Sequence, residues 1–159
     1  MVDKKIIIFG KKYDVMFREA KYNKIVQSNK KVYVYFRDKK PERLLNRYLR
    51  NLLYSYILQL LQEFTERGLL CGVIKIKIID TLEKPTILAR LRGNYIELSH
   101  KLVYAPKSII RYVLAHELSH LLVKNHTTKF FAILDALLPE GSDMDQHDLH
   151  NFKNLRIFS

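Results

Sequence analysis

Cysteine and tryptophan are scarce in this 159-residue chain, which has one cysteine, Cys71, and no tryptophan. A single thiol cannot form a disulfide within the chain, and its isolation fits a reducing compartment. We interpret it as a small buried residue beside Gly72. One cysteine also excludes a cysteine-rich zinc site, so a zinc ion would depend on histidine and carboxylate ligands.

Long apolar runs are missing as well. No stretch approaches the roughly 18 apolar residues that a membrane-spanning helix needs. The N-terminus is basic and then apolar, but the apolar stretch Ile6–Phe9 is too short for a signal peptide. We therefore expect a cytoplasmic protein with no membrane partner.

Acidic residues are few: 16 aspartates and glutamates face 28 lysines and arginines, for a net charge of +12. Residues 1–40 carry 12 basic and 4 acidic residues, whereas residues 113–159 carry 4 basic and 6 acidic ones. Such a charge attracts polyanions, DNA or RNA first among them. A lysine-rich composition can equally reflect genome bias or thermal adaptation, so DNA is a candidate partner only.

The length fits one domain with a real core, and a 48% hydrophobic content is ordinary for a globular protein. We divide the chain into a basic, β-rich N-terminal part (1–40), a core (41–139) and a polar tail (140–159). Four β-prone runs occupy the first part: Ile6–Phe9, Tyr13–Phe17, Lys21–Gln27 and Val32–Phe36. In the last run Tyr33 and Tyr35 share one face, which is either covered or meets a partner.

A long amphipathic helix is predicted from Pro41 to Gly68, because paired apolar residues recur every four positions. Three strands follow, Val73–Ile79, Thr86–Arg92 and Tyr95–Ser99, which we expect to form an antiparallel meander. Its polar face would carry the candidate phosphate contacts Lys75, Lys77, Arg90 and Arg92. An ordinary solvated sheet face is the alternative.

The most informative segment is His116-Glu117-Leu118-Ser119-His120, an HExxH pattern in an apolar run that favours a helix beginning near Pro106. Helix residues four apart face the same side, so His116 and His120 can bind one Zn²⁺. Glu117 projects beside a metal held there and can take a proton from a water molecule. Two histidines on a helix surface would be the alternative.

A catalytic zinc site needs a third protein ligand, and His126 is the nearest candidate. The motif helix would have to end after Val123, and Asn125 tolerates the backbone conformation used just past a helix end. A second helix, Lys129–Leu138, capped by the two preceding threonines, would then place His126 at a corner. Glu140, twenty residues after His120, is the alternative ligand, and Asp135 a weaker one.

Three segments resemble the YgjP-like metallopeptidases and are similar to their SprT-like and WLM relatives in the zincin group. They are the I-x-L-S-type strand within Tyr95–Pro106, the HELxH helix within Ile109–Leu121, and the Asn-His-x-x-x-Phe pattern within Asn125–Phe131. The resemblance implies an α+β, minimal zincin-like domain with a mostly antiparallel sheet, one long amphipathic helix and an HExxH helix.

The resemblance also implies site residues and a substrate class. His116, His120 and His126 match the metal ligands of the family, and Glu117 matches the general base. Protein or peptide is the implied substrate and Zn²⁺ the implied cofactor. The SprT-like and WLM relatives degrade proteins crosslinked to DNA, which makes a DNA-associated protease a hypothesis here.

The residue that would stabilise the oxyanion is not evident from the sequence. The candidates are Tyr104, Tyr112, His147 and His150. The last two could instead form a second metal site, although a polar tail accounts for them equally well. Two other functions stay open: a nucleic-acid-binding protein with a structural or vestigial zinc, and a zinc hydrolase acting on a substrate other than protein.

Overall fold

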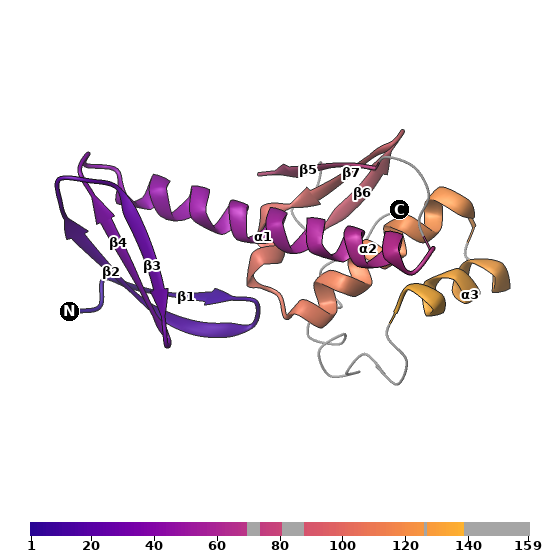
Figure 1. Cartoon of the computed structure of the whole chain (residues 1–159), viewed down its shortest axis with the longest axis horizontal. Helices are drawn as coiled ribbons and strands as arrows, with labels where there is room; N and C mark the ends of the chain where they lie inside the picture. The colour runs from indigo at the N-terminus through magenta and orange to yellow at the C-terminus, as the bar shows by residue number, and fades with distance from the viewer. Residues whose placement is uncertain (70–73, 81–87, 126, 139–159) are drawn as a thin grey trace.

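A 26-residue helix, α1 (Pro41–Glu66), runs the length of the molecule between two small β-sheets in the computed structural model (Figure 1). The structure describes residues 1–69, 74–80, 88–125 and 127–138. One stripe of α1 is buried: Leu45, Leu49, Leu53, Ile57, Leu60 and Phe64. Their spacing confirms the predicted amphipathic helix, with Pro41 in its first turn.

The N-terminal sheet contains β1 (Lys4–Ile8), β2 (Lys11–Glu19), β3 (Lys24–Ser28) and β4 (Lys31–Phe36) in the order β1-β2-β4-β3. Strands β2 and β4 are parallel, and the other two pairs are antiparallel. All four predicted strands are therefore present, with shifted ends. The alternating residues Val32 and Val34 of β4 are buried in the core that this sheet shares with α1.

The turn between β1 and β2 ties this sheet to the rest of the molecule. The amides of Phe9 and Gly10 donate to the carbonyls of Val103 and Tyr104, at 2.7 and 3.1 Å. These carbonyls belong to a 3₁₀ helix, η1 (His100–Tyr104). Gly10 has a φ of +82°, and a Cβ there would lie 3.1 Å from Pro106 Cγ, so both conformation and space favour glycine.

The second sheet differs from the predicted meander. It contains β5 (Lys75–Ile79), β6 (Ala89–Arg92) and β7 (Tyr95–Ser99) in the order β5-β7-β6, with β5 parallel to β7. The prediction that all three are antiparallel was wrong, and β7 is the central strand. Its charged residue Glu97 pairs with Arg90 on β6 at 2.9 Å.

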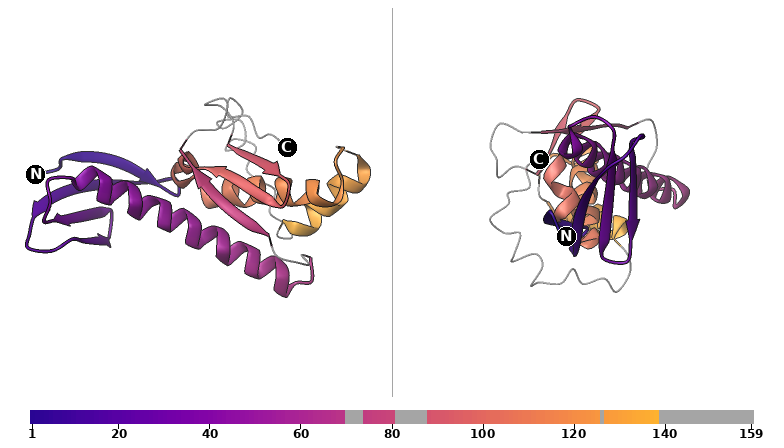
Figure 2. Two further views of the ribbon diagram at one scale, coloured as in Figure 1. Left: turned by 90° about the horizontal axis from the view of Figure 1, so that it is seen from above. Right: turned by 90° about the vertical axis from the view of Figure 1, so that its left-hand side faces the viewer.

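Two helices follow the second sheet. α2 (Lys107–Leu122) carries the HExxH motif and α3 (Thr128–Leu137) packs against it (Figures 1 and 2). Pro106 precedes α2 directly, and Thr127 caps α3 by accepting from the Phe130 amide. The helix ends at Leu122, one residue before the predicted end at Val123, and Val123 is extended.

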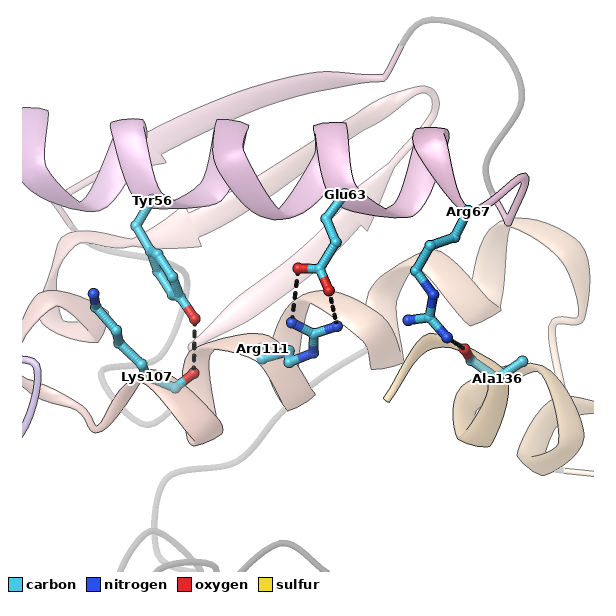
Figure 3. A network of polar contacts seen from close by, with 6 residues as sticks. All are labelled: Tyr56, Glu63, Arg67, Lys107, Arg111 and Ala136. Carbon is cyan, nitrogen blue, oxygen red and sulfur yellow. Dashed lines mark hydrogen bonds and ion pairs between the residues drawn. The ribbon is translucent and has the colours of Figure 1, made fainter. Parts of the chain in front are cut away.

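Polar contacts join α1 to the two helices that follow (Figure 3). Arg111 of α2 donates two hydrogen bonds to the Glu63 carboxylate of α1, at 2.8 and 2.9 Å. Arg67, just beyond α1, donates to the carbonyl of Ala136 in α3, at 3.1 Å. Because a bidentate arginine–carboxylate pair fixes orientation as well as distance, this contact sets how α2 lies along α1.

Glu63→Gln should lower the melting temperature at pH 7 and leave it nearly unchanged at pH 3. The hydrogen bond from Arg111 lowers the pKa of Glu63, although burial opposes it. A lowered folded-state pKa contributes stability above the unfolded value of about 4.3 and loses it as the pH falls further. Thermal unfolding of the variant and of Glu19→Gln, an exposed carboxylate of β2, measures the effect. An equal loss at both pH values would contradict it.

The architecture confirms the predicted α+β class, with two mixed sheets that are mostly antiparallel and three α-helices in the described ranges. None of the helices within those ranges is long and apolar enough to cross a membrane. The boundaries drawn at residues 40 and 139 stay predictions, and the tail at 140–159 lies outside the described residues.

Candidate active site

The HExxH motif lies in the most enclosed part of α2. Every residue from Val113 to His120 is buried, and the two histidines keep only 8% and 7% of their surface exposed. The edge strand β6 packs against this helix, and α3 covers it as well. The motif is therefore not a pair of histidines on a solvated helix surface.

The imidazole rings of His116 and His120 lie side by side, as their four-residue spacing predicted. Their centroids are 4.9 Å apart and their planes are nearly perpendicular. Phe130 of α3 contacts both rings, at centroid distances of 5.3 Å from His116 and 4.5 Å from His120. This fully buried aromatic ring restricts how either imidazole can turn.

The tautomer of His120 follows from a single contact. Its Nδ1 lies 3.1 Å from the carbonyl oxygen of Val123, and a carbonyl can only accept, so Nδ1 carries the proton. The lone pair is then on Nε2, the nitrogen that a metal ion would bind. Histidine ligands in metal sites characteristically hold their other nitrogen in this way.

Glu117 is the most unusual group of the site. Its side chain is completely buried, and no described residue makes a well-formed hydrogen bond to either carboxylate oxygen. The nearest charged partner is His116, whose Nδ1 lies 3.7 Å from Oε1. Burial raises the pKa of Glu117, and His116 and the backbone amide of Leu91 in β6 oppose this only in part.

The described residues do not supply a third metal ligand. Among them, no group of three His, Cys, Asp or Glu side chains could hold a metal ion. Asp135 is exposed on α3, so the structure does not bring it to the two histidines. His126 and Glu140, the other two candidates, lie outside the described residues. The position of His126 at the corner between the two helices therefore stays a prediction.

Of the two oxyanion candidates that are described, Tyr112 lies beside the motif, with its ring centroid 6.1 Å from that of His116. Burial raises the pKa of Tyr112, so its hydroxyl stays protonated and can donate. Tyr104 instead lines a cavity of about 450 Å³ with Arg43, Arg47 and Arg50 of α1. His147 and His150 lie outside the described residues.

The four basic residues of the second sheet do share one face. The register aligns Lys75, Tyr95 and Arg92 in one row, and Lys77, Glu97 and Arg90 in the next. Glu97 is only 7% exposed and accepts hydrogen bonds from Arg90. This carboxylate, which the sequence argument overlooked, lowers the positive charge at the centre of the predicted phosphate-contact face.

Sequence reasoning missed three other groups at the site: the Phe130 ring, the Val123 carbonyl and the Leu91 amide. Phe130 was visible in the Asn-His-x-x-x-Phe pattern, but nothing in the pattern assigned it a role. The two backbone groups carry no sequence signal, because any residue supplies a carbonyl and almost any supplies an amide.

Together the fold and the site define a small α+β domain with an HExxH helix beside β6, an edge strand of the second sheet within the described ranges. Over residues 2–150 the chain matches the family described as YgjP-like, metallopeptidase domain, and it belongs to that family. The match includes the N-terminal sheet, beyond the segments that carried the resemblance. The comparison with curated proteins found no match.

Proposed function

We propose that this member of the metallopeptidase family is a zinc-dependent protease that hydrolyses peptide bonds. One observation carries the proposal: a fully buried glutamate lies beside two histidines on one helix turn, and no described group makes a well-formed hydrogen bond to its carboxylate. A buried carboxylate with only weak partners is costly, and such a group is characteristic of a catalytic site. A merely structural zinc site would have no use for it.

The residues present fit a zinc ion. Two neutral imidazoles that converge from one helix are ligands that zinc prefers, and the contact to Val123 already holds His120 in the ligand tautomer. We propose His126 as the third ligand, from the corner between α2 and α3. When bound, zinc supplies a Lewis acid that polarises a carbonyl and acidifies a water molecule.

Glu117 is the proposed general base. The raised pKa of Glu117 lies closer to neutral pH. A group with such a pKa can both accept a proton and return it. It would take a proton from the attacking water on one oxygen and later deliver it to the leaving amine. Tyr112 is the proposed donor to the oxyanion, since its hydroxyl remains protonated.

An extended substrate would pair with β6, the edge strand beside α2, and not with the central strand β7. An edge strand offers unpaired amides and carbonyls that a peptide can extend as another strand. Because β6 packs directly on the motif helix, a peptide added there would pass close to Glu117.

Removing the metal should abolish the activity reversibly. We expect a chelator such as 1,10-phenanthroline to stop cleavage of casein, and stoichiometric Zn²⁺ to restore it, whereas Mg²⁺ should not. Histidine nitrogens suit zinc, while magnesium prefers an all-oxygen octahedron. Restoration by Mg²⁺, or cleavage that persists in the metal-free protein, would reject the zinc-dependent mechanism.

We also propose that the protease associates with nucleic acid, as the hypothesis of action on DNA-bound proteins requires. The net charge of +12, concentrated in residues 1–40, supports this association. A cytoplasmic location stays a prediction based on the single cysteine. Cleavage of casein and of a DNA-bound protein, each with and without added DNA, measures the dependence, and indifference to DNA would remove this part of the proposal.

A further inference from the structure

The outer face of the N-terminal sheet carries a row of tyrosines that the core does not use. Tyr33 and Tyr35 project from β4, and their rings are stacked, with planes only 18° apart and centroids 6.4 Å apart. Tyr22, in the loop before β3, continues the row, with its centroid 6.1 Å from that of Tyr35. We call these three residues the tyrosine face.

This face is distinct from the hydrophobic core. The core side of β4 is formed by Val32 and Val34, both fully buried, whereas Tyr33 and Tyr35 alternate with them and are half-buried. Tyr22 is 56% exposed. Met16 pairs with Tyr33 across the sheet and is buried, although it lies outside the main core cluster.

Positive charge surrounds the tyrosine face. In the register, Arg18 and Lys24 flank Tyr35, and Lys31 lies next along β4 on the same face. Side chains alternate between the two faces of a strand, so Lys5 of β1 and Lys12 of β2 lie on this face as well. The acids on this side are Asp14, which lies between Lys5 and Lys31 in the register, and Asp3, which is 3.7 Å from Arg18. Basic groups therefore outnumber acidic ones.

A hollow of about 720 Å³ lies where β2 begins and β3 turns into β4, at the end of the sheet where Lys31 lies. Lysines line it from both sides: Lys11 and Lys12 from β2, and Lys30 from the turn into β4. Lys12 contributes to both the hollow and the face, so positive charge continues from one to the other. Figure 1 shows this sheet at one end of the molecule, and the right-hand view of Figure 2 looks onto that end.

We propose that the tyrosine face binds single-stranded nucleic acid, with bases stacked on the tyrosine rings and phosphates held by the surrounding lysines. Exposed aromatic rings on a sheet, interleaved with basic residues, are the combination that binds unpaired bases. A duplex would offer the phosphates but not the base faces, and an acidic peptide would offer only charge. The inference deepens the proposed nucleic-acid association and is independent of the peptidase activity.

The test is fluorescence anisotropy of labelled oligonucleotides of about twelve nucleotides, within the range of known binding sites. Oligo-dT and oligo-rU form two arms that separate DNA from RNA, and a DNA duplex forms a third. Tyr35→Ala in the whole chain should weaken binding of a single strand about tenfold, since each stacked base contributes on that order. Tyr35→Phe keeps the ring and should retain the affinity.

Matched variants separate stacking from charge. Lys31→Ala should lower the salt dependence of single-strand binding by about 0.7 in the log–log slope, whereas Tyr35→Ala should leave the slope unchanged. Tyr54→Ala removes an exposed tyrosine of α1, which lies outside the tyrosine face, and should change nothing. Circular dichroism of the Tyr35 variants confirms that the chain is folded.

Three results would overturn the proposal. Equal affinity of wild type and Tyr35→Ala for single strands would show that binding, if present, uses another surface. Equal losses for duplex and single strand would show that the rings do not contact bases. Complete competition by poly-glutamate at equal charge would show that the face recognises charge alone. If no nucleic acid binds at all, the wider association fails too, whereas casein cleavage would still test the protease separately.

Discussion

Glu117→Gln should lower kcat/KM for peptide hydrolysis by about 10² to 10⁴-fold while the zinc content of the protein stays the same. Glutamine has nearly the same shape but cannot accept the proton of the attacking water. Because the carboxylate is fully buried and no described group makes a well-formed hydrogen bond to it, it contributes little to the stability of the described structure. The loss should therefore appear in catalysis and not in folding.

The measurement is cleavage of casein by wild type and variant at equal zinc content, determined by mass spectrometry. Glu66→Gln, an exposed carboxylate at the end of α1, is the matched control and should keep wild-type activity. We expect the metal-free Glu117→Gln protein to melt no lower than wild type, because it no longer buries a carboxylate. Equal residual cleavage by wild type and variant would remove Glu117 from the mechanism.

His126→Ala should reduce the bound zinc from about one ion per chain to well below that, and cleavage should fall with it. The two histidines of α2 alone leave the ion with fewer protein ligands than catalytic zinc sites use. Glu140→Ala and Asp135→Ala are matched comparisons at the two rival positions. Asp135→Ala should have no effect, because that carboxylate is exposed on α3.

Zinc stoichiometry after dialysis against a weak chelator ranks the three variants directly. A larger loss in Glu140→Ala than in His126→Ala would reassign the third ligand to the carboxylate. Loss in neither would mean that another group outside the described residues completes the site. Circular dichroism of each metal-free variant separates a lost ligand from a lost fold.

Local features of the site followed from the sequence because they depend on helical spacing. The four-residue interval alone predicts that His116 and His120 lie side by side, and their rings do, 4.9 Å apart. The end of α2 at Leu122 and the cap of α3 at Thr127 were predictable for the same reason, since a helix end depends on a few neighbouring residues.

The pairing between strands that are distant in the sequence could not be predicted. Nothing local distinguishes a parallel from an antiparallel neighbour, so the parallel pairing of β5 with β7 was missed. The charged residue Glu97 gave no indication that β7 is the central strand, because its partner Arg90 lies on the neighbouring strand. The same limit applies to Phe130, whose contact with both histidines depends on how α3 folds back against α2.

The central claim is that one zinc ion sits on the histidines of α2 within reach of Glu117. Anomalous diffraction at the zinc absorption edge, from crystals of the zinc-loaded protein, tests it most directly. The account predicts one peak about 2.0–2.1 Å from a ring nitrogen of each of His116 and His120, with Nε2 the ligand atom of His120. A peak elsewhere, such as on His147 and His150, or no peak at saturating zinc, would contradict it.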